Sequence, residues 1–237
     1  MKRFLIVLTL VTAFAMTAQA QFLNYGVRVG AGFSTHVDDL ADNSPILAAN
    51  VGGFVTFGFT QSASLLAENF RLQTGVNFIH RGSKFQEVLE TAMSIREGSY
   101  DAWYVQIPIL ATIHYELPIR EPGHFALLSV GPAFNIGAFG TVKDRKFSHG
   151  MPMGDWNYRI ESSAFDVMNR FDVDLLFGVG YEYEDLSVML QLDYGFMAVT
   201  ETPDALEAVN GTNPNAKVPL GNNVALLLTV GYQFPFR

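Results

Sequence analysis

Two aspartates separated by one residue are the first feature of this sequence that could do chemistry. Asp172 and Asp174 lie in a segment in which apolar and polar residues alternate. A spacing of two residues in a strand puts both side chains on one face, about 6–7 Å apart. Paired carboxylates can serve as acid and base in glycoside hydrolysis or can bind a metal ion. No partner motif accompanies this pair, so the sequence does not predict catalysis there.

The other residue types that commonly carry chemistry form no recognisable site. The five histidines are scattered, and the chain has no cysteine; they are His36, His80, His114, His124 and His149. None of their spacings is typical of metal ligands. Ser129 lacks the G-x-S-x-G setting of a nucleophile, and Ser148-His149 is only an adjacent pair. We therefore predict no enzyme activity, no metal and no cofactor.

The elements that carry these residues are indicated by alternation with a period of two, which is typical of strands. The C-terminal segment is the clearest case, with apolar residues at every second position: Val224, Leu226, Leu228, Val230, Tyr232, Phe234 and Phe236. Similar alternation covers residues 25–33, 171–183 and 186–196. Less regular strands are expected at about 50–59, 70–80, 102–116 and 124–139. The sequence thus predicts eight strands.

The connections between these strands alternate in length. Long loops are expected at 34–49, 81–99, 140–169 and 197–221, and short turns at 60–69, 117–123 and 184–185. Long loops on one side and short turns on the other are typical of bacterial outer-membrane barrels. We therefore predict an all-β fold, an eight-stranded antiparallel up-and-down transmembrane β-barrel over residues 21–237. An even number of strands puts both termini on the periplasmic side.

The N-terminal residues have the pattern of a secretory signal peptide. Lys2 and Arg3 precede an uncharged, largely apolar stretch, and Ala18-Gln19-Ala20 offers small residues at a cleavage site. The apolar stretch is too short to span a membrane, which takes about 20 apolar residues. We predict that residues 1–20 are a cleaved signal peptide and that the mature chain begins at Gln21.

A polar face on several strands predicts what fills the barrel. Alternation places nine polar residues on the inward side: Arg28, Arg71, Gln73, Asn77, Asp172, Asp174, Glu182, Gln191 and Asp193. Glycines on this polar face and aromatic residues at strand ends favour lipid on the outside. An eight-stranded barrel is just wide enough to be filled by side chains, and buried charges require partners. We expect a salt-bridged plug; a narrow ion path or a small binding site is the alternative.

Several strand motifs resemble those of the PorT-like outer-membrane β-barrel family. They are Tyr104-Val105-Gln106-Ile107-Pro108-Ile109-Leu110, Gly131-Pro132-Ala133-Phe134, Phe171-Asp172 with Gly178-Val179-Gly180-Tyr181, Leu192-Asp193-Tyr194-Gly195, and Gly231-Tyr232-Gln233-Phe234. In order, they cover almost the whole mature chain. Gln106 departs from the glutamate usual in that family, and the chain ends in Phe236-Arg237. One branch of the family is associated with type IX secretion, but nothing in the sequence places the chain in that branch.

These observations predict a non-enzymatic outer-membrane barrel with a structural or interaction role in the cell envelope, and leave open a link to a secretion assembly. Two alternatives stay open: a narrow pore for ions or small solutes, and a soluble periplasmic ligand-binding barrel. The expected partners are outer-membrane lipid and envelope proteins, the latter through the loops 81–99, 140–169 and 197–221. A net charge of −8 argues against a nucleic-acid partner.

Overall fold

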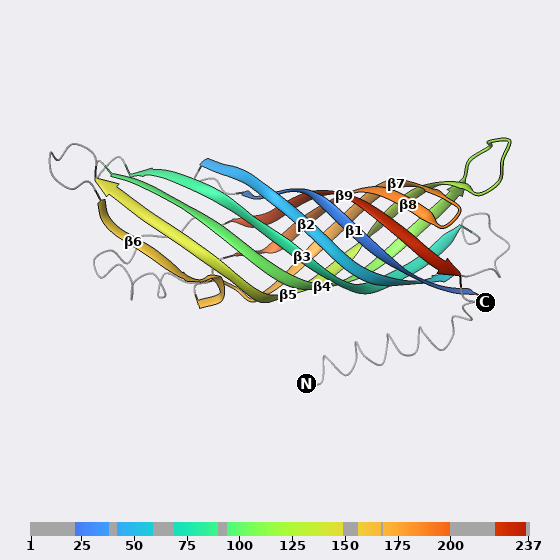
Figure 1. The fold of residues 1–237 in the computed structure, drawn as a ribbon, viewed down its shortest axis with the longest axis horizontal. Helices are drawn as coiled ribbons and strands as arrows, with labels where there is room; N and C mark the ends of the chain where they lie inside the picture. The colour runs from blue at the N-terminus through green and yellow to red at the C-terminus, as the bar shows by residue number, and fades with distance from the viewer. Residues whose placement is uncertain are drawn as a thin grey trace, which may run out of the picture.

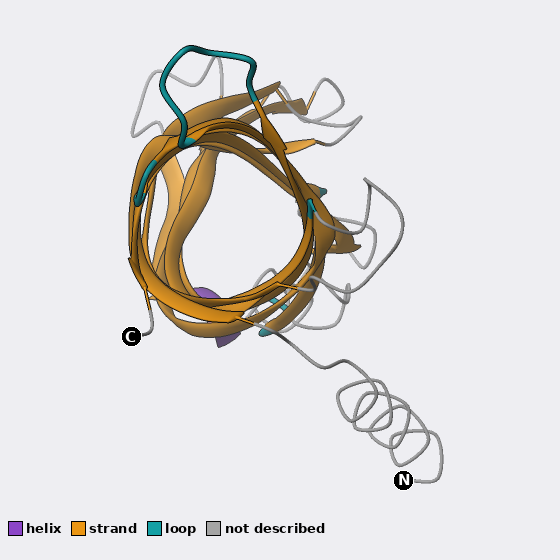
Figure 2. Cartoon of the chain, turned by 90° about the vertical axis from the view of Figure 1, so that its right-hand side faces the viewer, coloured by secondary structure: helices purple, strands orange, loops and turns teal. Residues whose placement is uncertain are grey.

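Eight strands close into an antiparallel barrel in the computed structural model, which describes residues 22–37, 42–58, 69–89, 94–148, 156–166, 168–199 and 221–235. The barrel strands are β1 (Phe22–Val37), β2 (Asp42–Gly58), β3 (Phe70–Leu89), β4 (Ser94–Glu116), β5 (His124–Ser148), β7 (Phe171–Tyr183), β8 (Leu186–Ala198) and β9 (Asn222–Pro235). Each pairs with its neighbours in the chain, and β1 pairs with β9. Figure 2 shows the resulting ring of strands. The predicted fold class is confirmed.

Alternation of side chains explains why the chain closes in this way. Along β7, buried residues alternate with exposed or partly exposed ones over nearly its whole length. Pairing of β1 with β9 closes the barrel, so that its first and last strands are not left as free sheet edges. No helix within the described residues is long and apolar enough to cross a membrane. The predicted signal peptide, residues 1–20, lies outside the described residues and stays a prediction.

The strands on one side of the barrel are longer than the sequence predicts. The expected loops 34–49 and 81–99 are wrong, because β1 and β2 leave only residues 38–41 between them, and β3 and β4 only 90–93. The expected loop 140–169 holds the end of β5, strand β6 (Trp156–Ser163) and the short 3-10 helix η2 (Ala164–Asp166). Most of 197–221 lies outside the described residues. Backbone ladders continue here without regular apolar alternation because backbone hydrogen bonds do not depend on side-chain polarity.

The two ends of the barrel therefore differ, as Figure 1 shows. At one end lie the connection 117–123, the start of β1 and the arrowhead of β9. The two-residue turn between β7 and β8 lies there too, with Glu184 at a φ of 52°. Both short connections agree with the prediction. At the other end β3, β4 and β5 project as a sheet, and β6 pairs with the far part of β5. We call these the turn end and the distal end.

Candidate functional site

The barrel has an apolar outside and a polar inside. On β9, Leu228 is 55% exposed, whereas the next residue, Thr229, is 4% exposed. The large exposed apolar side chains of the other strands follow the same parity. The soluble ligand-binding barrel that the sequence left open would need the reverse arrangement. Inside the barrel the structure places all nine of the predicted polar residues: Arg28, Arg71, Gln73, Asn77, Asp172, Asp174, Glu182, Gln191 and Asp193.

Near the turn end, the polar contacts gather on the buried carboxylate of Glu182. Arg71 Nη1 lies 3.7 Å from its Oε1, and His114 Nδ1 lies 3.3 Å from the same oxygen. Gln233 Nε2 donates to Oε2 at 2.7 Å. The four groups come from β3, β4, β7 and β9 and meet across the lumen. A single carboxylate therefore ties β7 to β3, β4 and β9, none of which is its neighbour in the sheet.

A second buried cation, Arg28 on β1, is held by an amide rather than by a carboxylate. Its Nη2 donates to Gln73 Oε1 at 2.6 Å, and Gln73 Nε2 donates to Thr56 Oγ1 at 3.2 Å. The guanidinium also lies over the ring of Phe54, 4.5 Å from its centroid. Such stacking on an aromatic face is favourable when the cation is removed from water. Arg28 thus links β1, β2 and β3.

Farther along the axis, Asp193 accepts hydrogen bonds from two glutamines. Gln191 Nε2 donates to Oδ1 at 2.7 Å, and Gln106 Nε2 donates to Oδ2 at 3.1 Å. Gln106 Oε1 in turn accepts from Asn77 Nδ2 at 3.1 Å. An amide can donate to a carboxylate and accept from another amide at the same time, whereas an ionised glutamate can only accept. Glutamine at position 106 thus suits a site that already holds the carboxylate of Asp193.

The closest ion pair of the lumen joins Arg81 and Asp174. The two groups are 2.6 Å apart, and both side chains are fully buried. The guanidinium also lies 5.0 Å from the ring centroid of Tyr104. Arg81 was not among the residues predicted from the sequence, because it falls in the expected loop 81–99. It has the same parity as Asn77, and extending the expected strand 70–80 by one residue would have included it.

At the distal end, Ser83, His36 and Asn223 form a hydrogen-bonded line. His36 Nδ1 lies 2.9 Å from Ser83 Oγ, and His36 Nε2 lies 2.9 Å from Asn223 Oδ1. Asn223 Nδ2 donates to Asp172 Oδ2 at 3.1 Å. The residue types resemble those of a hydrolase triad. Ser83 has no exposed surface, however, and the ring of Tyr100 stacks on His36. A substrate cannot reach this serine, so the line is structural.

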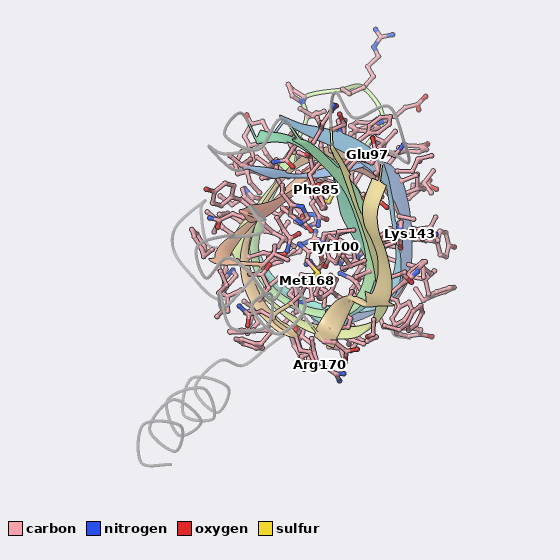
Figure 3. All side chains as sticks on the ribbon, turned by 90° about the vertical axis from the view of Figure 1, so that its left-hand side faces the viewer. Phe85, Glu97, Tyr100, Lys143, Met168 and Arg170 are labelled. Carbon is pink, nitrogen blue, oxygen red and sulfur yellow. The ribbon has the colours of Figure 1, made fainter. Side chains whose placement is uncertain are left out.

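The segment that follows β6 closes the lumen above this line. Phe165 of η2 packs edge-on against Tyr104, with ring centroids 5.5 Å apart, and Met168 is also buried. Gly137 makes room for this ring, since a β-carbon there would collide with it. The backbone N–H of Gly137 donates to the carbonyl of Arg170 at 2.6 Å. Figure 3 shows Met168 inside the ring of strands, beside Tyr100 and Phe85.

Some buried polar atoms of the lumen have no hydrogen-bond partner among the described residues. Both amide atoms of Asn50 and of Asn135 are in this position, as is Asp174 Oδ1. Buried polar atoms of this kind usually bind ordered water. Within the described residues, no group of three or more His, Asp or Glu side chains could hold a metal ion. The lumen is therefore a cross-linked polar interior.

Comparisons with known proteins agree with this architecture. A family model described as "Outer membrane protein beta-barrel domain" matches residues 17–201. No curated protein matches the chain.

Several solved structures resemble the fold at low identity. The N-terminal β-barrel domain of Pseudomonas aeruginosa OprF shares 12% identity at a TM-score of 0.32, covering 88% of this chain and 97% of that one. Neisserial surface protein A shares 9% at 0.36, covering 89% and 97%. Ail of Yersinia pestis, in complex with the heparin analogue sucrose octasulfate, shares 10% at 0.35, covering 90% and 100%. At these TM-scores the likenesses support no inference about function.

Proposed function

The chain belongs to the family of the outer membrane protein beta-barrel domain, and from this premise we propose that it is a closed, non-enzymatic barrel with a structural or interaction role in the cell envelope. One observation carries the proposal: the lumen is crossed by buried side-chain contacts from end to end. Glu182 ties strands together near the turn end, and Arg81 pairs with Asp174 beneath Phe165. Side chains that are fixed in this way hold the wall in one shape.

We propose no catalysis because a substrate cannot reach the residues that could carry it. The line of Ser83, His36 and Asn223 has residue types suited to acyl transfer, but all three are buried. Catalysis of that kind needs a nucleophile within reach of a bound substrate. The carboxylates of the lumen are likewise engaged, Asp193 by two glutamines and Asp174 by Arg81.

The test is planar-bilayer recording with protein purified from an outer-membrane fraction. The folded protein should first show a heat-modifiable shift on a gel, as stable barrels do. It should then give no steady current. A variant with Phe165→Ala and Met168→Ala opens the distal closure without touching the ion pairs and serves as the comparison. Large, stable openings by the wild type would contradict the closed barrel.

A narrow pore is the second candidate, and one observation favours it. The amides of Asn50 and Asn135 are buried without partners on opposite parts of the wall. Hydration at these groups would give a thread of water within the lumen. In that case the double variant Phe165→Ala with Met168→Ala should conduct small ions, and Asn135→Leu introduced into it should reduce the current. No current from the double variant would rule this candidate out.

Orientation and partners form part of the proposal. We place both termini and the connection 117–123 in the periplasm, and the distal end at the cell surface. Envelope partners would then bind through 140–169, 197–221 and the outward side chains of 81–99, which is strand except for 90–93. A protease added to intact cells should cut within 140–169 and leave 117–123 whole; the opposite pattern would reverse the orientation. A place beside a secretion assembly, which the PorT-like resemblance leaves open, would require such a partner to copurify with the chain.

A further inference from the structure

The outer surface of the distal sheet carries a hollow whose lining includes several polar side chains. A row of four paired residues crosses it from β2 to β5: Ser44 opposite Lys84, Lys84 opposite Ser99, and Ser99 opposite Lys143. The hollow has a volume of about 500 Å³, and Phe85, Gln86, Glu97 and Gly98 complete its lining. Lys84 and Lys143 are exposed. Figure 3 shows Lys143 and Glu97 outside the ring of strands, whereas Phe85 lies within it.

An aromatic cluster below the hollow indicates its height relative to the membrane. Phe78, Trp103 and Phe139 lie together on the outer face, with centroids of the first two 5.1 Å apart and of the last two 6.2 Å apart. Aromatic rings on a barrel wall mark the boundary between hydrocarbon and headgroups. Lys143 lies four residues beyond Phe139 on β5. At ~3.3 Å per residue and a tilt of ~40°, it stands about 10 Å above the rings.

The charge and position of the hollow indicate its ligand. Two adjacent strand spacings of about 4.8 Å separate the lysine positions, so their ammonium groups can approach one anionic group from both sides. The hydroxyls of Ser44 and Ser99 lie in the same row, and Glu97 can accept a hydrogen bond from a hydroxyl. At headgroup height in the outer leaflet, the molecule that combines phosphate with sugar hydroxyls is a phosphorylated glycolipid.

We propose that the hollow bordered by Ser44, Lys84, Ser99 and Lys143 binds the phosphorylated sugar headgroup of an outer-leaflet glycolipid. The inference rests on the proposed function, because it requires the distal end to lie at the outer leaflet. The acyl chains of the glycolipid would then lie along Phe78, Trp103 and Phe139 below the hollow. The bound lipid would belong to the first shell around the barrel and would fix the height of the distal sheet.

The experiment measures binding of purified lipid A to the detergent-folded protein by calorimetry. The test variant combines Lys84→Gln with Lys143→Gln. Arg120→Gln is the matched control, since Arg120 is exposed in the connection at the turn end. Lysines near an anionic headgroup contribute enough that the double variant should bind about 30-fold more weakly, which corresponds to about 2 kcal/mol. The control should bind like the wild type.

A second measurement uses lipid A from which the phosphates have been removed. The wild type should bind it as weakly as the double variant binds the intact lipid, which keeps the test decisive if the double variant folds poorly. Equal binding of both lipids by the wild type would overturn the proposal, as would equal binding by all variants. Displacement of lipid A by inorganic phosphate at equal concentration would mean a small-anion site instead. If the wild type folded stably in buffer without detergent, that result would instead refute the membrane barrel itself.

Discussion

Replacing Arg81 by methionine should destabilise the folded barrel by about 3–5 kcal/mol. Arg81 and Asp174 form a fully buried pair at 2.6 Å. Asp193 and Asp172 also lie within electrostatic range of the guanidinium. Removing one partner of a buried ion pair leaves the other charge without compensation, and such changes cost about 3–5 kcal/mol. Methionine keeps most of the volume of the side chain, so the loss of packing adds little.

The assay is equilibrium unfolding in urea with the protein inserted in lipid vesicles, followed by the heat-modifiable gel shift. A double-mutant cycle with Asp174→Asn separates the pair from its surroundings. The double variant should recover a large part of the loss, because no uncompensated charge remains at position 174. Arg120→Met is the control; Arg120 is exposed at the turn end, and surface changes usually stay within about 0.5 kcal/mol. An Arg81→Met variant as stable as the control would refute the view that this pair fixes the lumen.

Two further changes test the closure and the lipid face. Gly137→Ala should push Phe165 out of its place, so that chymotrypsin cleaves after Phe165 faster than in the wild type, as measured by mass spectrometry. Gly53→Ala is the control, because the nearest heavy atom lies 3.6 Å from the added carbon there. This control should leave the cleavage rate unchanged. Leu228→Arg should cost about 2–4 kcal/mol of folding free energy in vesicles, against about 0–1 for Leu186→Arg beside the β7–β8 turn. Equal effects within either pair would contradict the placement of these residues.

Parity along the strands allowed most of the lumen to be predicted. Asp172, Asp174 and Glu182 lie on a strand whose other face is strongly apolar, so their inward direction follows from their spacing alone. Position in the sequence says nothing, however, about which groups on different strands meet. That depends on the register around the barrel, which brings Arg71 to Glu182 and Gln106 to Asp193.

What the sequence did not reveal lies beyond the lipid-facing band. Arg81 and His36 fall in stretches where apolar and polar residues alternate less regularly, so that alternation no longer distinguishes a strand from a loop. The ladder itself continues there because backbone hydrogen bonds do not depend on side-chain polarity. The packing of Phe165 into the lumen could not be predicted from the sequence either. It requires the space above Gly137, which exists only after β5 and the segment following β6 have come together.

The measurement that tests the central claim most directly is a cysteine scan of β9. The chain has no cysteine of its own, so single cysteines at positions 225 to 230 can each carry a spin label. In lipid vesicles, collision with dissolved oxygen should peak at Leu226, Leu228 and Val230 and fall at Leu227 and Thr229. Such an oscillation with a period of two would place the apolar face in lipid and the polar face in the lumen. Oxygen access that is uniform, or highest at 227 and 229, would contradict the membrane barrel described above.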